Sequence, residues 1–108
     1  MVAITGETLG RGDDDLGRRL MTRFLGQLAT LPKKPHVVAF YNAGVRLLVV
    51  GSAVVDVLQA LEREGADLLA CGTCVDHFGI RDQLAVGRVS DMREIVSAML
   101  AADKVVGA

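Results

Sequence analysis

The chain has 108 residues, of which 51% are hydrophobic and 23% charged, and its formal net charge is −1. This length suits one domain, because two independent cores would each be too small to be stable. Acidic and basic residues are interspersed and aromatic residues make up only 4%, so neither a basic nucleic-acid-binding face nor a base-stacking platform is expected. No apolar run is long enough to cross a membrane, and the first residues lack the features of a signal peptide. We therefore expect a cytoplasmic protein with a single domain over residues 1–108.

The first part of the chain predicts a strand followed by a long helix. Val2–Ile4 is a short apolar strand that leads into the glycine-rich loop Gly6–Gly12. Asp13–Asp15 then offer an N-cap and favourable first-turn charge to a helix, which Pro32 and Pro35 end because neither can continue its hydrogen bonding. The apolar face of this helix is expected to contain Leu16, Leu20, Met21, Phe24, Leu25 and Leu28.

The next segment predicts a buried strand, a turn and a second helix. His36–Tyr41 is a continuous apolar run, which is typical of a strand covered on both faces. Asn42–Gly44 forms a turn, and Val45–Val50 is either a further short strand or an irregular apolar segment. Ser52 is expected to cap a helix over Ala53–Glu64.

Strands and helices continue to alternate in the last third. Asp67–Cys71 predicts a strand, and Val86–Val89 predicts another. Asp91 and Glu94 form a capping-box pattern at the start of a final helix. Lys104–Val106 closes the chain as a short strand.

Alternation of strands and helices predicts right-handed crossovers and a mainly parallel sheet. We therefore expect an α/β three-layer sandwich of about five strands with a flavodoxin-like architecture. Ligands and chemistry in such sheets gather at the carboxyl ends of the strands. Three segments are expected to meet there: the loop Gly6–Gly12, the turn Asn42–Gly44 and the loop Cys71–Cys74.

The loop Cys71-Gly72-Thr73-Cys74 is the main candidate for chemistry. If Thr73 caps a short helix, Cys74 lies in its first turn and Cys71 just before it, so both sulfurs would lie near amide hydrogens that favour the thiolate. Gly72 would allow a sharp turn and leave Cys71 accessible. The second thiol could then resolve a persulfide or disulfide formed on the first. The alternative is that both cysteines are small apolar residues packed at the end of a strand.

Three further residues near these loops have a functional and a simpler interpretation. His77 is most simply an exposed helical residue, but it lies one turn beyond Cys74 and could hold a proton near the thiol. Arg11, in the glycine-rich loop, could contact an anion, but Asp13–Asp15 follow it and would repel one. The simpler interpretation of this loop is a solvent-exposed turn and helix cap. Asn42 is most simply a turn residue.

A metal site is not expected from the cysteine spacing. Cys71, Cys74 and His77 follow a Cys-x-x-Cys-x-x-His pattern, but a closed zinc site needs four ligands. His36 is the remaining histidine, and it is predicted at the opposite end of its strand. We expect neither a metal nor another cofactor.

Several motifs keep a fixed order over almost the whole chain: Gly10-Arg11-Gly12 with Leu16-Gly17, Phe40-Tyr41-Asn42-Ala43-Gly44-Val45, Gly51-Ser52, Leu61-Glu62 with Gly65, Cys71-Gly72-Thr73-Cys74, and Val86-Gly87 with Met92. Together they resemble the carboxyl-terminal domain of the YedF family, a DsrE-like domain associated with selenium metabolism. In longer members a small TusA-like sulfur-carrier domain precedes this one. Ser90-Asp91-Met92 departs from the family pattern, which reads more like Thr-Asn-Met.

The resemblance implies a role in sulfur relay. In active DsrE-like members a cysteine at the end of the corresponding strand, followed eight residues later by glycine, carries a persulfide; Cys71 and Gly79 are similar to that pattern. It therefore implies Cys71 as the carrier and Cys74 as partner or resolver, in a sulfurtransferase-like carrier more than a turnover enzyme. It also implies a homo-oligomer and a TusA-like protein as partner. The alternatives are a non-catalytic binding or assembly module with buried cysteines, and a dithiol–disulfide redox module.

Overall fold

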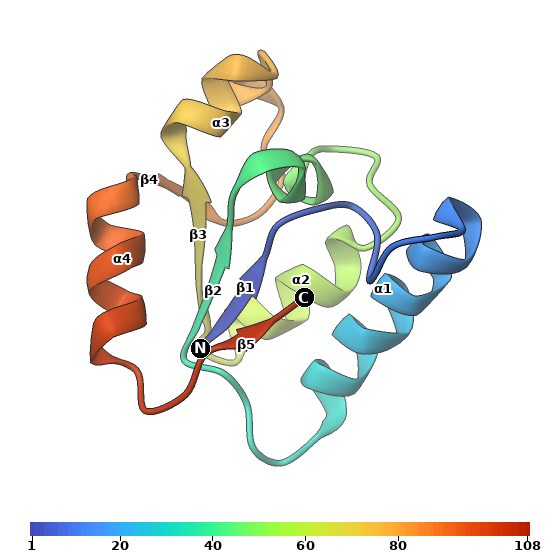
Figure 1. The fold of residues 1–108 in the computed structure, drawn as a ribbon, viewed down its shortest axis with the longest axis horizontal. Coiled ribbons are helices and arrows are strands. Elements are labelled where there is room, and N and C mark those ends of the chain that lie inside the picture. The colour runs from blue at the N-terminus through green and yellow to red at the C-terminus, as the bar shows by residue number, and fades with distance from the viewer.

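A computed structural model describes residues 1–108. Its five strands form one sheet in the order β4-β3-β2-β1-β5, and every neighbouring pair is parallel (Figure 1). The strands are β1 Val2–Ile4, β2 Val37–Phe40, β3 Asp67–Cys71, β4 Arg88–Ser90 and β5 Val106–Gly107. The predicted parallel sheet of five strands is confirmed.

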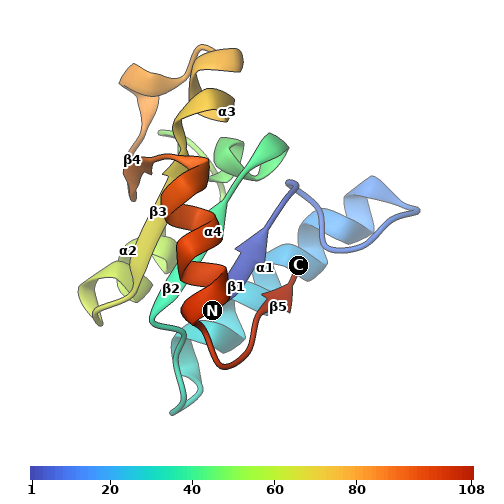
Figure 2. The same cartoon turned by 60° about the vertical axis from the view of Figure 1, so that its left-hand side comes forward.

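Helices cover both faces of this sheet, as Figures 1 and 2 show. α1 and α2 lie on one face, α4 lies on the other, and the short α3 extends beyond the carboxyl ends of the strands. The helices are α1 Asp14–Thr30, α2 Val55–Arg63, α3 Gly72–His77 and α4 Met92–Ala101, with 3-10 segments η1 Asn42–Leu48 and η2 Arg81–Gln83. None of them combines the length and the apolar character that a membrane span requires.

Alternating strand residues supply two separate apolar layers. Val38 and Phe40 of β2 belong to the main core of 18 buried residues, together with residues of α1 and α2. Ala39, between them, belongs to a second layer of four buried residues that also contains Ile95 of α4. Burial on both faces explains why β2 is apolar at every position.

Side-chain caps start two helices where they were predicted. The Leu16 amide donates to the Asp13 carboxylate at 2.8 Å, and the Glu94 amide donates to Asp91 at 2.8 Å. Each bond satisfies an amide that has no partner within its helix.

The buried face of α1 differs from the prediction. Leu16 is 47% exposed and Leu20 is 38% exposed, whereas Gly17, Met21 and Leu25 are buried. A Cβ at Gly17 would come within 2.6 Å of the Thr8 Cβ. Because Gly17 packs against Thr8, it lies on the buried side of α1. Leu16 and Leu20 are therefore directed toward solvent.

Two segments between β2 and β3 also differ from the sequence-based expectation. Most of the uncertain segment 45–50 belongs to η1, and the bridge that Val49 makes to Leu84 is antiparallel. α2 begins after Val54, whose amide donates to the Ser52 Oγ at 3.4 Å, so Ser52 caps the turn before the helix.

An ion-pair network holds α4 against the sheet. The Arg88 guanidinium donates to both carboxylate oxygens of Asp67 at 2.9 Å, and to Glu94 at 2.6 and 3.1 Å. These bonds join β4, β3 and α4. Arg88 also holds the pKa of Glu94 below its ordinary value, and the nearby Ser90 hydroxyl contributes to that shift. Because these side chains are about half exposed, their main effect is on geometry.

Two glycine substitutions should have opposite effects on stability. A Cβ at Gly44 would lie 2.2 Å from the Ile4 carbonyl oxygen, whereas one at Gly26 would meet nothing within 4 Å. Gly44→Ala should therefore lower the free energy of unfolding by at least about 2 kcal/mol. Gly26→Ala, within α1, should raise it by about 0.5–1 kcal/mol. Urea denaturation measures both; equal effects would contradict the close packing of η1 against β1.

Candidate functional site

The cysteine turn is a direct connection between β3 and α3. Cys71 is both the last residue of β3 and the N-cap of α3, which begins at Gly72. Thr73, the predicted N-cap, instead lies in the first turn and is exposed. The reason is close packing at Gly72, where a Cβ would approach the Ser90 carbonyl oxygen to 3.0 Å. The backbone of the turn thus lies directly against the end of β4.

Cys71 is buried, and the expectation of an accessible thiol at this residue was wrong. It is 2% exposed and packs with Ala39, Leu69 and Ile95. Leu69 and Cys71 are two residues apart in β3, so they point to the same face of the sheet, the one that α4 covers. The alternation of side chains continues to Cys71, the last residue of β3. It places the Cys71 sulfur in the second apolar layer, the one that contains Ile95.

Cys74 is the more accessible of the two free thiols. It is partly buried, and its Sγ accepts a hydrogen bond from the Asn42 backbone amide at 3.0 Å. Asn42 has a φ of 51°, a left-handed conformation that asparagine adopts more readily than most residues. The turn after β2 therefore directs an amide hydrogen at a sulfur 32 positions away.

The surroundings of Cys74 favour the protonated thiol. Burial raises the pKa of Cys74 above its ordinary value, and the neighbouring Cys71 raises it further. The Asn42 amide opposes this shift because its hydrogen bond stabilises the thiolate. Burial is the stronger effect, so at neutral pH Cys74 is mainly a thiol.

Some of the other predicted site residues lie beside the cysteines and others do not. Gly72, Thr73 and Asn42 surround the cysteines, as the convergence of strand ends predicted. His77 is exposed at the end of α3, where its ring packs edge-on against Phe78 at 5.1 Å. Arg11 is exposed in a loop that runs away from α3 toward α1 (Figures 1 and 2). No three His, Cys, Asp or Glu side chains lie close enough together to hold a metal ion.

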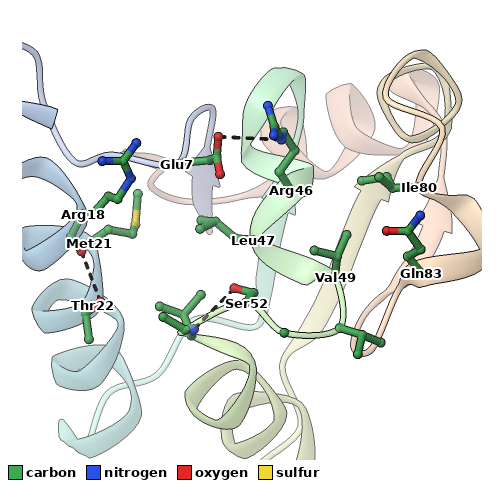
Figure 3. A pocket seen from close by; sticks show the side chains of 14 residues that line it. Glu7, Arg18, Met21, Thr22, Arg46, Leu47, Val49, Ser52, Ile80 and Gln83 are labelled. Carbon is green, nitrogen blue, oxygen red and sulfur yellow. Dashed lines mark hydrogen bonds and ion pairs between the residues drawn. The ribbon is translucent and has the colours of Figure 1, made fainter. Parts of the chain in front are cut away.

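A cavity that was not predicted from the sequence lies on the α1 side of η1. This cavity has a volume of about 420 Å³ and is lined in part by Glu7, Arg18 and Arg46 (Figure 3). Its charged residues come from three separate segments, so no local motif predicts it. The two cysteines do not line it.

The chain resembles known proteins in sequence profile and in fold. The sequence profile of the DsrE/DsrF-like family matches residues 18–107. The chain belongs to the DsrE/DsrF-like family. This confirms the predicted DsrE-like domain, while the finer resemblance to YedF stays a prediction. No protein with a curated description matches the sequence.

Three solved structures have a fold similar to that of this chain, and each aligns with 99% of its residues. YchN from Escherichia coli has a TM-score of 0.66 and 20% identity, with 97% of its own chain covered. MTH1491 from Methanobacterium thermoautotrophicum, a protein of unknown function, has a TM-score of 0.71, 21% identity and 96% coverage. BT1422 from Bacteroides thetaiotaomicron, also of unknown function, has a TM-score of 0.66, 16% identity and 93% coverage. At these identities the likeness shows a shared fold.

The two thiols should differ in reactivity. In the folded protein, iodoacetamide should alkylate Cys74 well before Cys71, because Cys71 is 2% exposed. In urea the two rates should converge. Intact-mass and peptide mass spectrometry of a time course measure both rates. Alkylation of Cys71 first would show that its packing under α4 is wrong.

The pH dependence of Cys74 alkylation should reflect its raised pKa. The thiolate is the reacting species, so in Cys71→Ser the rate should still be rising at pH 9.0, the ordinary thiol value. In urea, where burial is lost, the profile should move to lower pH. Loss of the Cys71 neighbour reduces the shift without reversing it, because burial is its largest cause. A rate that is constant above neutral pH would contradict the protonated state of this thiol.

Proposed function

We propose that this DsrE/DsrF-like chain is a sulfur or selenium relay protein. It accepts a chalcogen atom as a persulfide-type adduct on the Cys71–Cys74 turn and passes it to a partner. The observation that carries this proposal is the partly exposed residue Cys74, whose Sγ accepts a hydrogen bond from the Asn42 amide at 3.0 Å. A second thiol, Cys71, lies beside it at the carboxyl ends of a parallel sheet, where chemistry gathers in α/β folds.

Cys74 is the first acceptor in this scheme, because it is the accessible thiol. Its thiolate attacks the outer sulfur of a donor persulfide, R–S–SH, and forms Cys74–S–SH while R–S⁻ leaves. The Asn42 amide stabilises the thiolate that starts this step. Onward transfer repeats the chemistry: the thiolate of an acceptor attacks the outer sulfur and the Cys74 thiolate is released. A TusA-like sulfur carrier supplies such a thiol.

Cys71 acts as the partner of Cys74. Its thiolate can attack the inner sulfur of Cys74–S–SH, which forms a Cys71–Cys74 disulfide and releases HS⁻. Cys71 is 2% exposed and packed under α4, which restricts its approach to that sulfur, so this discharge is slow and the adduct persists. The reverse order, with Cys71 as carrier and Cys74 as resolver, requires α4 to move away from the end of β3 so that a donor reaches Cys71.

The outer face of α4 carries a row of exposed apolar side chains. Met92, Val96 and Leu100 follow one another at four-residue spacing on α4 and are 45%, 42% and 83% exposed. Such an apolar row on the outside of a helix is typical of a protein contact. We infer that the protein is a homo-oligomer, as the family resemblance also suggests.

The burial of Cys71 also favours a second candidate function. In a non-catalytic binding or assembly module, both cysteines would be packing residues, and neither would react in the folded protein. The 2% exposure of Cys71 fits that role. The partial exposure of Cys74 and its amide bond fit the relay better.

Incubation with a persulfide donor tests the relay. Wild type and Cys71→Ser should gain the mass of one sulfur atom in the folded state, whereas Cys74→Ser should gain none, because it lacks the accessible thiol. Intact-mass spectrometry measures the gain, and reductant should reverse it. A gain that depends on Cys71 alone would reverse the two roles. Absence of any gain, with both thiols inert until denaturation, would favour the packing module. A loss of two hydrogens without stable sulfur would indicate a dithiol–disulfide couple.

A further inference from the structure

The cavity on the α1 side of η1 combines an apolar floor with opposite charges at its mouth. Met21, Leu47 and Val54 are 1%, 8% and 3% exposed and form part of its wall. In Figure 3, Glu7 lies between Arg18 and Arg46, above Leu47. A volume of about 420 Å³ lies at the lower end of the range of small-molecule sites.

The charged groups at the mouth retain unused hydrogen-bonding capacity. The Arg46 Nε and the nearest Glu7 oxygen are 3.8 Å apart, which is too far for a hydrogen bond. Neither side chain makes another ion pair within the chain, and Arg46 is otherwise held by the face of Phe78, 5.4 Å from the ring centroid. Arg18 makes one side-chain contact, to Asp15 at 3.3 Å. A carboxylate and two guanidinium groups therefore face the cavity with free acceptors and donors.

These groups restrict the chemistry of a ligand. A simple anion would satisfy the arginines but bring a like charge toward Glu7, and a simple cation would do the reverse. A neutral apolar molecule would displace water from all three charged groups and would not replace the hydrogen bonds that the water makes to them. A zwitterion with an apolar side chain matches both parts of the cavity. Its ammonium and carboxylate are joined through a single carbon, so they can pair with neighbouring opposite charges at the mouth. Its side chain can lie on the apolar floor.

We propose that this cavity binds a free α-amino acid with a small apolar side chain. The carboxylate pairs with Arg46 and Arg18, the ammonium pairs with Glu7, and the side chain lies over Met21 and Leu47. The site does not use the cysteines, and it stands whether or not the chain relays sulfur.

NMR titration of ¹⁵N-labelled protein with L-norleucine tests this proposal. Norleucine should shift the amide signals of the cavity wall, chiefly Leu47 and 51–54. Hexanoate lacks the ammonium of norleucine and pentylamine lacks its carboxylate, so each should bind at least about tenfold more weakly, the loss expected for one charge-assisted pair. Failure of norleucine to shift these signals, or equal binding of hexanoate, would overturn the proposal.

Matched variants show whether the named side chains form the site. Arg46→Gln and Glu7→Gln should each weaken norleucine binding at least about tenfold. Arg19→Gln is the control, since Arg19 lies on α1 outside the cavity and is exposed, and it should bind as wild type does. An equal loss in all three variants would mean a general charge effect and would overturn the assignment. The Cys71→Ser/Cys74→Ser double variant should bind norleucine normally, which separates this site from the relay chemistry.

Discussion

The packing of Gly72 against the end of β4 determines the geometry of the cysteine turn. Its backbone lies so close to the Ser90 carbonyl that a Cβ would stand 3.0 Å from that oxygen, and β3 passes into α3 without a loop. Cys71 consequently keeps the alternation of the strand and points toward α4. Cys74, in the first turn of α3, instead faces the turn after β2. One Cys-x-x-Cys sequence thus holds two thiols in different surroundings.

Local signals in the sequence predicted most of the fold. The caps Asp13 and Asp91 start their helices as expected, and β3 has the predicted bounds Asp67–Cys71. These features depend on a few neighbouring residues, which the sequence displays directly. The segment 45–50 was less certain because apolar residues suit a strand and a buried 3-10 turn equally. The exposure of Leu16 and Leu20 depends on a contact with the loop before α1, which helical periodicity does not contain.

The candidate site was predicted in its location but not in its accessibility. The meeting of Asn42 and Cys74 follows from a parallel sheet, whose strand ends gather at one edge. That Leu69 and Cys71 share a face could also be read from the period of a strand. Whether that face is covered at Cys71, the last residue of β3, depends on α4, which begins 21 positions further along the chain. The hydrogen bond to Cys74 depends in addition on the left-handed conformation of Asn42, which the residue type permits but does not require.

A half-buried thiol with a raised pKa reacts slowly with small molecules in solution, because few thiolates are present. That property suits a relay better than a free thiolate would, since a carrier must accept its cargo from one donor and not from every electrophile it meets. The Asn42 amide stabilises the thiolate only in the position where Cys74 Sγ already lies, so no reorganisation is needed once a donor binds. A donor that covers Cys74 and supplies a cation or a further N–H donor would lower the pKa of that thiol at the moment of transfer. Reactivity would then depend on docking, which is how a persulfide can be passed between proteins without loss to solvent.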